Sequence, residues 1–264
     1  MLLTINVGNS NTVVGVMDGT EPRWRWRISS DTRTTDELGM LLLQLLSHQG
    51  LSAGDITGVC VCCVVPSLLY TVQKAVRRYL NQEALTVGSG VRTGMRLRVD
   101  NPREIGADRI VSAVAAYDRF GGPLVVVDFG TATTFDCIDS SGAYLGGAIA
   151  PGLKISADAL FQRTARLPRV ELTEPAAAIG SNTVASMQSG LFWGYVGLVQ
   201  ELARRCKSEL SAAGAPRCVA TGAMANLIGP ACSEVDEIDD HLTLRGLVLV
   251  YERNHRRRSP GRSG

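Results

Sequence analysis

The sequence predicts an α/β protein made of two similar lobes, each with a mixed sheet flanked by helices. Apolar, strand-like runs alternate along the chain with segments whose apolar residues recur at helical spacing, which is typical of α/β folds. One strand–turn–strand motif also occurs twice, at positions separated by almost half of the 264 residues. A chain of this length can form one large domain or two lobes with a sizeable core.

The first half of the chain contains four expected strands and three expected helices. The segment WRWRIS alternates apolar and charged residues, as a strand with one solvent-exposed face does. The first helix begins with Thr and Asp and ends at Gly50, which are both helix-boundary signals. The strands are expected at 1–7, 12–18, 24–29 and 56–65, and the helices at 34–50, 66–80 and 106–119.

The second half repeats the alternation and ends in a basic tail. Strands are expected at 123–129, 132–138, 144–150 and 217–222, and helices at 182–209 and 242–253. The final residues are rich in Arg, Pro, Gly and Ser, a composition that favours disorder. We therefore expect an N-terminal lobe over 1–118, a C-terminal lobe over 119–254 and a disordered basic tail over 255–264.

Composition and charge indicate an ordinary globular protein. The chain is 45% hydrophobic with a formal net charge of +2, which does not favour a nucleic-acid partner. We expect no membrane span and no secretory signal, because the sequence has no apolar stretch approaching ~20 residues. Cys60, Cys62 and Cys63 lack the C-x-x-C spacing of zinc sites, so we interpret them as small buried side chains in a reduced, cytoplasmic protein.

The repeated motif is the most informative feature. TINVGNSNTVVGV (4–16) and VVVDFGTATTFDCI (125–138) align at a spacing of 122 positions (128 minus 6). Both read as a strand, an Asn or Asp, a glycine turn with small polar residues, and a second strand. The alignment places Asn6 on Asp128, Gly8 on Gly130, Asn9 on Thr131 and Thr12 on Thr134.

Such a turn has the chemistry of a phosphate-binding loop. Glycine lets the backbone approach a ligand closely, and successive N–H groups form a concavity that binds anions. A carboxylate on the residue that ends the first strand can hold Mg²⁺ through a water molecule. The alternative is two ordinary hairpin turns, for which Asn- and Gly-rich connections are the default. Two equivalent turns favour phosphate binding.

With both turns present, the sequence resembles the type III pantothenate kinases of the acetate kinase/sugar kinase/actin superfamily. The matching motifs follow one another along nearly the whole chain, and their order makes the combination specific. They are NVGNSNTVVGV (6–16), DNPREIGADRI (100–110), VVVDFGTATTFD (125–136), GGAIAPGL (146–153), IGSNTVASMQSG (179–190), ATGAMA (220–225) and LTLRGLVLVYERN (242–254).

The resemblance implies two actin-like (ribonuclease H-like) lobes with a ligand cleft between them. It implies phosphorylation of pantothenate by ATP with Mg²⁺, the first step of coenzyme A biosynthesis, in a cytoplasmic homodimer. Thr131 matches an ATP contact of the second turn. The first phosphate loop would consist of Asn6, Val7, Gly8, Asn9, Ser10, Asn11, Thr12 and Val13.

The resemblance also implies the substrate and cation residues. Asp108 would accept the proton of the attacked hydroxyl, and Asp128 would bind a monovalent cation, K⁺ or NH₄⁺. Pantothenate would contact Val99, Gly106, Ala107, Asp108, Arg109 and Thr183. Other readings stay open: Asp108 could stabilise a helix N-terminus, Asp128 could cap the following turn, and Thr183 could cap a helix.

Several positions depart from the family pattern. The family carries Asp where this chain has Asn6, so a negative charge near the metal and triphosphate is absent. Ser10 replaces the usual Thr, Val99 replaces a Tyr found in many members, and Ala223 replaces a common Gly. Three hypotheses follow: a pantothenate kinase slowed by Asn6, a weak or inactive protein that binds nucleotide or pantothenate and has a regulatory role, or a kinase for another small acid.

Overall fold

The computed structural model describes residues 1–255, which form two compact units. Among the described residues, the first unit contains 1–95, 101–115 and 241–255, and the second contains 96–100 and 116–240. The chain therefore crosses between the units more often than the expected division at 118/119 requires. The expected tail lies outside the described residues, apart from His255, which is the last residue of a helix.

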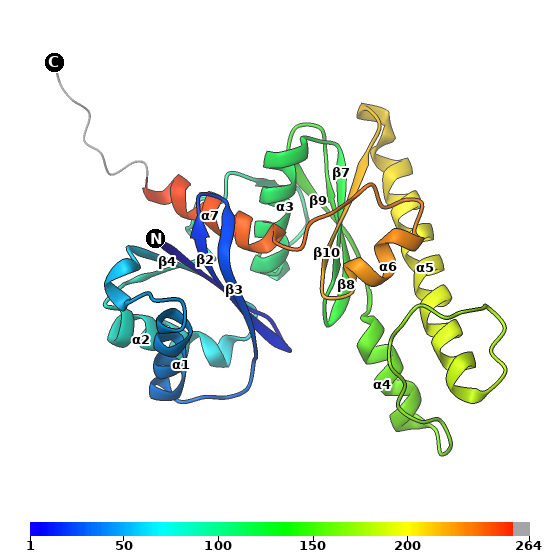
Figure 1. Ribbon diagram of the computed structural model, residues 1–264. Coiled ribbons are helices and arrows are strands. Elements are labelled where there is room, and N and C mark those ends of the chain that lie inside the picture. The colour runs from blue at the N-terminus through cyan, green and yellow to red at the C-terminus, as the bar shows by residue number, and fades with distance from the viewer. Residues whose placement is uncertain (256–264) are drawn as a thin grey trace. The chain divides into compact units, whose positions relative to one another are not determined.

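The first unit contains a five-stranded mixed sheet in the order β3-β2-β1-β4-β5 (Figure 1). The central strand β1 pairs antiparallel with β2 and parallel with β4. The mixed sheet that the sequence predicts is therefore present. The strands are β1 (Leu2–Val7), β2 (Asn11–Asp18), β3 (Glu21–Ser29), β4 (Gly58–Cys63) and β5 (Ala84–Thr86).

Helices cover both faces of this sheet. Helices α1 (Thr35–Ser47) and α2 (Pro66–Leu80) enclose one core with β1, β2 and β4, and Trp24 and Trp26 of β3 pack against that core, as the alternation of WRWRIS predicts (Figure 1). On the opposite face, α7 (Leu242–His255) and the first part of α3 (Ala107–Phe120) pack against β4.

The C-terminal helix was expected in the second lobe, and its packing explains why it belongs to the first unit. Leu244, Leu247 and Val248 of α7 are buried with Cys60 and Cys62 of β4. Gly246 of α7 lies so close to the carbonyl group of Val111 in α3 that a Cβ atom there would overlap it. Burial of this apolar face stabilises the helix against β4 and α3 rather than beside its neighbours in sequence.

The second unit contains a six-stranded sheet in the order β11-β10-β7-β8-β9-β6. The long helix α5 buries Leu191, Phe192, Tyr195 and Val199 against β7, β8 and β10. The strands are β6 (Arg96–Leu97), β7 (Leu124–Phe129), β8 (Ala132–Ile138), β9 (Ala143–Pro151), β10 (Arg217–Gly222) and β11 (Glu237–Ile238). The helices are α4 (Leu153–Arg163), α5 (Thr183–Leu210) and α6 (Ala225–Ile228).

The elements that sequence reasoning did not predict are short or weakly patterned. Strands β5, β6 and β11 have two or three residues, too few for an alternation, and α4 has only one fully buried residue, Leu153. Short 3₁₀ turns connect other elements at Ala53–Asp55, Pro102–Glu104, Ser211–Ala213 and Gly229–Ala231. Within residues 1–255, no helix has the length and apolar character needed to span a membrane.

Candidate functional site

The first glycine turn joins β1 to β2 and is closed by its own backbone. The Gly8 N–H donates to the Asn11 carbonyl at 3.0 Å, and the Ser30 N–H donates to the Ser10 carbonyl at 3.1 Å. A Cβ atom on residue 8 would lie 3.0 Å from the Asn11 carbonyl oxygen. Glycine therefore lets the turn be tight, and Asn9, Ser10 and Asn11 are exposed at its tip.

The second glycine turn joins β7 to β8 in the same way but is one residue shorter. The Gly130 N–H donates to the Ala132 carbonyl at 3.1 Å, and the Gly152 N–H donates to the Thr131 carbonyl at 3.1 Å. The spacing of 122 positions between the two copies of the motif holds as far as Gly8 and Gly130. It does not hold for the strands that follow the turns. Thr12 pairs with Val7 and Thr133 pairs with Phe129, so the counterpart of Thr12 is Thr133 and not Thr134.

Asn6 is the next-to-last residue of β1, directly before Val7 and the turn. Its side chain faces away from the α1/α2 core. It lies in register between Val13 of β2 and Cys62 of β4. Its amide oxygen Oδ1 is buried and has no hydrogen-bond partner among the described residues. An unpaired buried acceptor is costly, so this atom fits a ligand or a metal-bound water.

Two side chains of the predicted ATP loop, Val7 and Thr12, point to the face of the sheet opposite to Asn6, because side chains alternate along a strand. Val7 is buried in the core with α1 and α2. The Thr12 hydroxyl is 2.9 Å from the Ser30 hydroxyl and is nearly fully buried. Thr12 thus lies on the face that α1 and α2 cover, whereas Val13 lies on the opposite face with Asn6.

Asp108 lies in the first turn of α3, on the same face of the sheet as Asn6. Its Oδ1 accepts the Arg109 N–H at 2.8 Å, and a Cβ atom at Gly106 would lie 2.5 Å from that oxygen. Burial raises the pKa of the Asp108 carboxyl, although the N–H and charge of Arg109 act in the opposite direction. Burial likewise raises the pKa of the Cys62 thiol, with the charge of Asp108 contributing. The apolar role expected for Cys62 is confirmed, because its side chain is fully buried.

In the second unit, Asp128 is the next-to-last residue of β7, as Asn6 is of β1. It pairs with Thr134 of β8 and with Thr221 of β10, the residue before Gly222. Gly222 has φ +93°, and a Cβ atom there would overlap Oδ1 of Asp128. Glycine at 222 is therefore required for the position of the Asp128 carboxylate. Sequence reasoning quoted this residue within ATGAMA but did not assign it that role.

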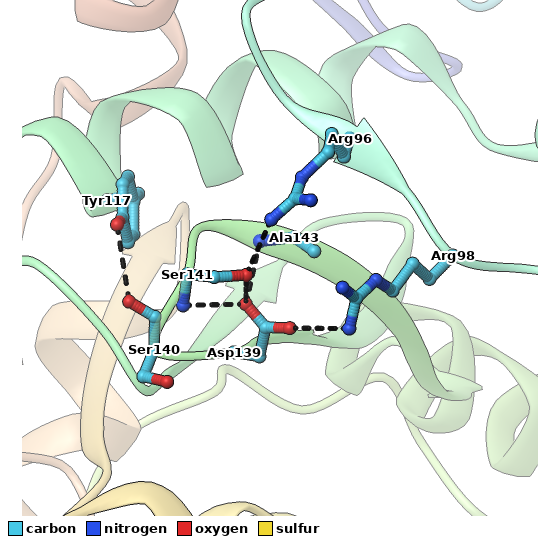
Figure 2. Close-up of polar contacts among 7 residues, drawn as sticks. All are labelled: Arg96, Arg98, Tyr117, Asp139, Ser140, Ser141 and Ala143. Carbon is cyan, nitrogen blue, oxygen red and sulfur yellow. Dashed lines mark hydrogen bonds and ion pairs between the residues drawn. The ribbon is translucent and has the colours of Figure 1, made fainter.

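The segment that precedes Val99 is held against the connection between β8 and β9 by Arg96 and Arg98 (Figure 2). Arg96 donates to the Ser141 hydroxyl at 2.9 Å, and Arg98 forms an ion pair with Asp139 at 3.3 Å. Burial acts to raise the pKa of Asp139, but hydrogen bonds from Ser141 and Ala143 and the charge of Arg98 lower it overall. A Cβ atom on Gly146 would lie 3.7 Å from Val99, so this side chain adjoins β9.

Thr183 is the first residue of α5 and is exposed. The N-cap is its neighbour Asn182, whose Oδ1 accepts the Ala185 N–H at 2.9 Å. The alternative in which Thr183 caps the helix is therefore wrong. Each unit contains a part of the predicted site: the loop 6–13 and residues 106–109 belong to the first, and Val99, Asp128, Thr131 and Thr183 belong to the second.

Comparison with known proteins decides the family. A sequence model of the family described as type III pantothenate kinase matches residues 2–205. The chain belongs to this family. It is 51% identical over 255 residues to the type III pantothenate kinase of Moorella thermoacetica, covering 96% of this chain and 100% of that protein. It is 53% identical over 255 residues to that of Anaeromyxobacter sp. strain Fw109-5, with the same coverage.

The fold agrees with a more distant solved structure. The activator of the 2-hydroxyisocaproyl-CoA dehydratase from Clostridium difficile, solved with bound ADPNP, is similar with a TM-score of 0.53 at 14% identity. The similarity covers 100% of this chain and 99% of that chain. At this identity the likeness is evidence of the fold alone. The predicted membership in the type III pantothenate kinases and the predicted α/β fold class are both confirmed.

The burial of Asp108 predicts a stability cost that depends on pH. Its carboxyl has a pKa above the ordinary 3.8 in the folded chain, so the unfolded chain loses the proton first as pH rises. The carboxylate therefore destabilises the fold at neutral pH, and the effect vanishes below the ordinary pKa. Asp108→Asn should be more stable than the wild type at pH 7 in urea unfolding, and this difference should shrink towards pH 4.

Asp118→Asn provides the matched control, because Asp118 is exposed on the same helix. A gain in stability by Asp108→Asn that is the same at pH 4 and pH 7 would contradict the assignment to the buried carboxylate.

Proposed function

We propose that this chain phosphorylates pantothenate with ATP to give 4′-phosphopantothenate, the first step of coenzyme A biosynthesis. The proposal rests chiefly on membership in the type III pantothenate kinases, with about half of the residues identical over nearly the whole chain. In the reaction, the acceptor hydroxyl oxygen forms a bond to the γ-phosphorus, and the bond from that phosphorus to the bridging oxygen of ADP breaks.

Asp108 is the residue we assign to the proton of the attacking hydroxyl. Its burial and raised pKa make the carboxylate a better proton acceptor than an exposed aspartate. Arg109 follows directly and supplies a permanently charged fork suited to the carboxylate of pantothenate. We place Gly106, Ala107, Val99 and Thr183 at the same substrate, and Thr131 with the loop 6–13 at ATP.

Asn6 fits a Mg²⁺ ion bound to ATP through water. No described residue donates a hydrogen bond to its buried Oδ1. This oxygen can therefore accept a hydrogen bond from a metal-bound water molecule. When bound, Mg²⁺ neutralises charge on the triphosphate. Because the amide is neutral, its attraction for that metal is weaker than that of a carboxylate, and we expect a slower enzyme for this reason.

The alternative, a weak or inactive protein that binds nucleotide or pantothenate and has a regulatory role, is not favoured. Relatives that share half of the sequence over nearly the full chain bear the name of the kinase. The Asp108 carboxyl is also largely buried, and this burial raises its pKa, as suits a proton acceptor. We place the reaction in the cytoplasm, where the seven free cysteines would stay reduced.

ATP-dependent phosphorylation of pantothenate by the purified protein tests this proposal. Asp108→Asn should lower kcat by roughly 10²- to 10⁴-fold because the proton acceptor is lost. Asn6→Asp should raise kcat/KM by about 30- to 1000-fold, since the added charge near the metal supplies ~2–4 kcal/mol. Asp118→Asn, on the same helix as Asp108, should match the wild type.

The proposal fails if neither the wild type nor Asn6→Asp transfers phosphate to pantothenate.

Replacing K⁺ or NH₄⁺ by Na⁺ in the same assay tests the further proposal that Asp128 binds a monovalent cation. Its side chain is half-buried, and its Oδ1 and the Phe129 carbonyl oxygen both lie beside Gly222. Asp128→Asn should remove most of the difference between the cations, and an undiminished preference would refute this role.

We also infer that two copies of the chain associate. The second unit exposes large apolar side chains, with Ile149 66%, Ile179 91% and Trp193 43% exposed. Gly190, Gly194 and Gly197 form an exposed stripe on α5 with open space around them, which allows close helix packing. Sedimentation should therefore give a dimer, and Gly194→Arg should give a folded monomer. A monomeric wild type would contradict this inference.

A further inference from the structure

The edge strand β3 presents three arginines on one face of the first unit. Trp24, Trp26 and Ile28 pack against the α1/α2 core, so the intervening Arg23, Arg25 and Arg27 lie on the opposite face, where all three are exposed. This is the face that α7 covers, because Nη1 of Arg25 is 3.2 Å from Nδ1 of His241, the residue before α7.

Arg27 lies in the same cross-strand row as Asn6. It pairs with Val13 of β2, and Val13 pairs with Asn6 of β1, which in turn pairs with Cys62 of β4. Residues paired in this way point to the same face of a sheet. Neighbouring strands are about 4.8 Å apart, so Arg27 and Asn6 are separated by roughly 10 Å of sheet. The side chain between them, Val13, is apolar.

Arg27 differs from its two neighbours in what it contacts. The guanidinium of Arg23 stacks 4.6 Å from the centre of the Trp24 ring, and Arg25 is paired with His241. Among residues 1–255, the guanidinium of Arg27 has no ion pair or hydrogen bond. Because residue 6 is an amide, its side chain carries no charge that would attract this guanidinium.

We propose that Arg27 binds the triphosphate of ATP, resting on the function proposed above. A side chain of this length can place its apolar stem along Val13, its paired residue, and its charged head over Asn6. There a guanidinium offers a planar, bidentate contact to phosphate oxygens. Arg27 thus adds a positive charge to a loop whose own side chains, from Asn6 to Val13, carry none.

An ordinary structural role for these arginines is to prevent edge-to-edge pairing of β3 with another sheet. That role makes Arg23 and Arg27 equivalent, since both are exposed on the same face of the same strand. Arg23 lies beside the far end of β2, at the irregularity between Val16 and Met17 where it has no paired residue, and is remote from the Asn6 row. Arg23→Gln is therefore a matched control for Arg27→Gln.

Calorimetric titration with ATP and Mg²⁺, and separately with AMP, tests the proposal. Charge-assisted hydrogen bonds predict that Arg27→Gln weakens ATP binding by about 10- to 100-fold. AMP binding should not change, because AMP lacks the β- and γ-phosphates. Arg23→Gln should bind ATP within about 2-fold of the wild type, and Arg27→Lys should recover part of the loss because it keeps the charge without the fork.

Each outcome has a distinct meaning. Unchanged ATP binding by Arg27→Gln, or an equal loss in Arg23→Gln, would overturn the role of Arg27 while leaving the proposed function intact. Failure of the wild type to bind ATP would overturn both. Circular dichroism and thermal unfolding of each variant show whether a loss comes from misfolding, and in that case recovery by Arg27→Lys decides the question.

Discussion

The backbone hydrogen bond that closes each glycine turn is the contact on which the predicted site depends. In the first unit it joins Gly8 to Asn11, and in the second it joins Gly130 to Ala132. Each bond fixes the register of the strand that follows. The register in turn decides which side chains point to each face of the sheet. The polar residues Asn6 and Asp128 thereby stay near the ends of their strands.

Burial gives these polar groups their chemistry at a cost in stability. Asn6 keeps an acceptor without a partner, and Asp108 keeps a carboxylate whose pKa burial raises. Neither arrangement stabilises the folded chain by itself. Apolar contacts elsewhere, such as α7 against β4 and α5 against β7, stabilise the fold enough to tolerate them. Sites that bind charged ligands commonly hold such unfavourable groups.

Local signals predicted much of this structure. The Thr and Asp at the start of the expected helix mark the beginning of α1, where Thr34 is the N-cap, and the alternation of WRWRIS sets the two faces of β3. Long-range packing could not be predicted in this way. No local pattern shows that α7 returns to the first unit, because that depends on its fit to Cys60, Cys62 and Val111. The shorter second turn was also hidden, since Thr133 and Thr134 are adjacent and either could be aligned with Thr12.

The central claim is that the Asn6 amide takes the place of an acid at the metal of bound ATP. The most direct measurement is the affinity for ATP with and without Mg²⁺, in the wild type and in Asn6→Leu, which has a similar shape and no acceptor. The account predicts that Mg²⁺ strengthens ATP binding to the wild type and that Asn6→Leu loses most of this gain while keeping its metal-free affinity. An equal gain from Mg²⁺ in both proteins would contradict it.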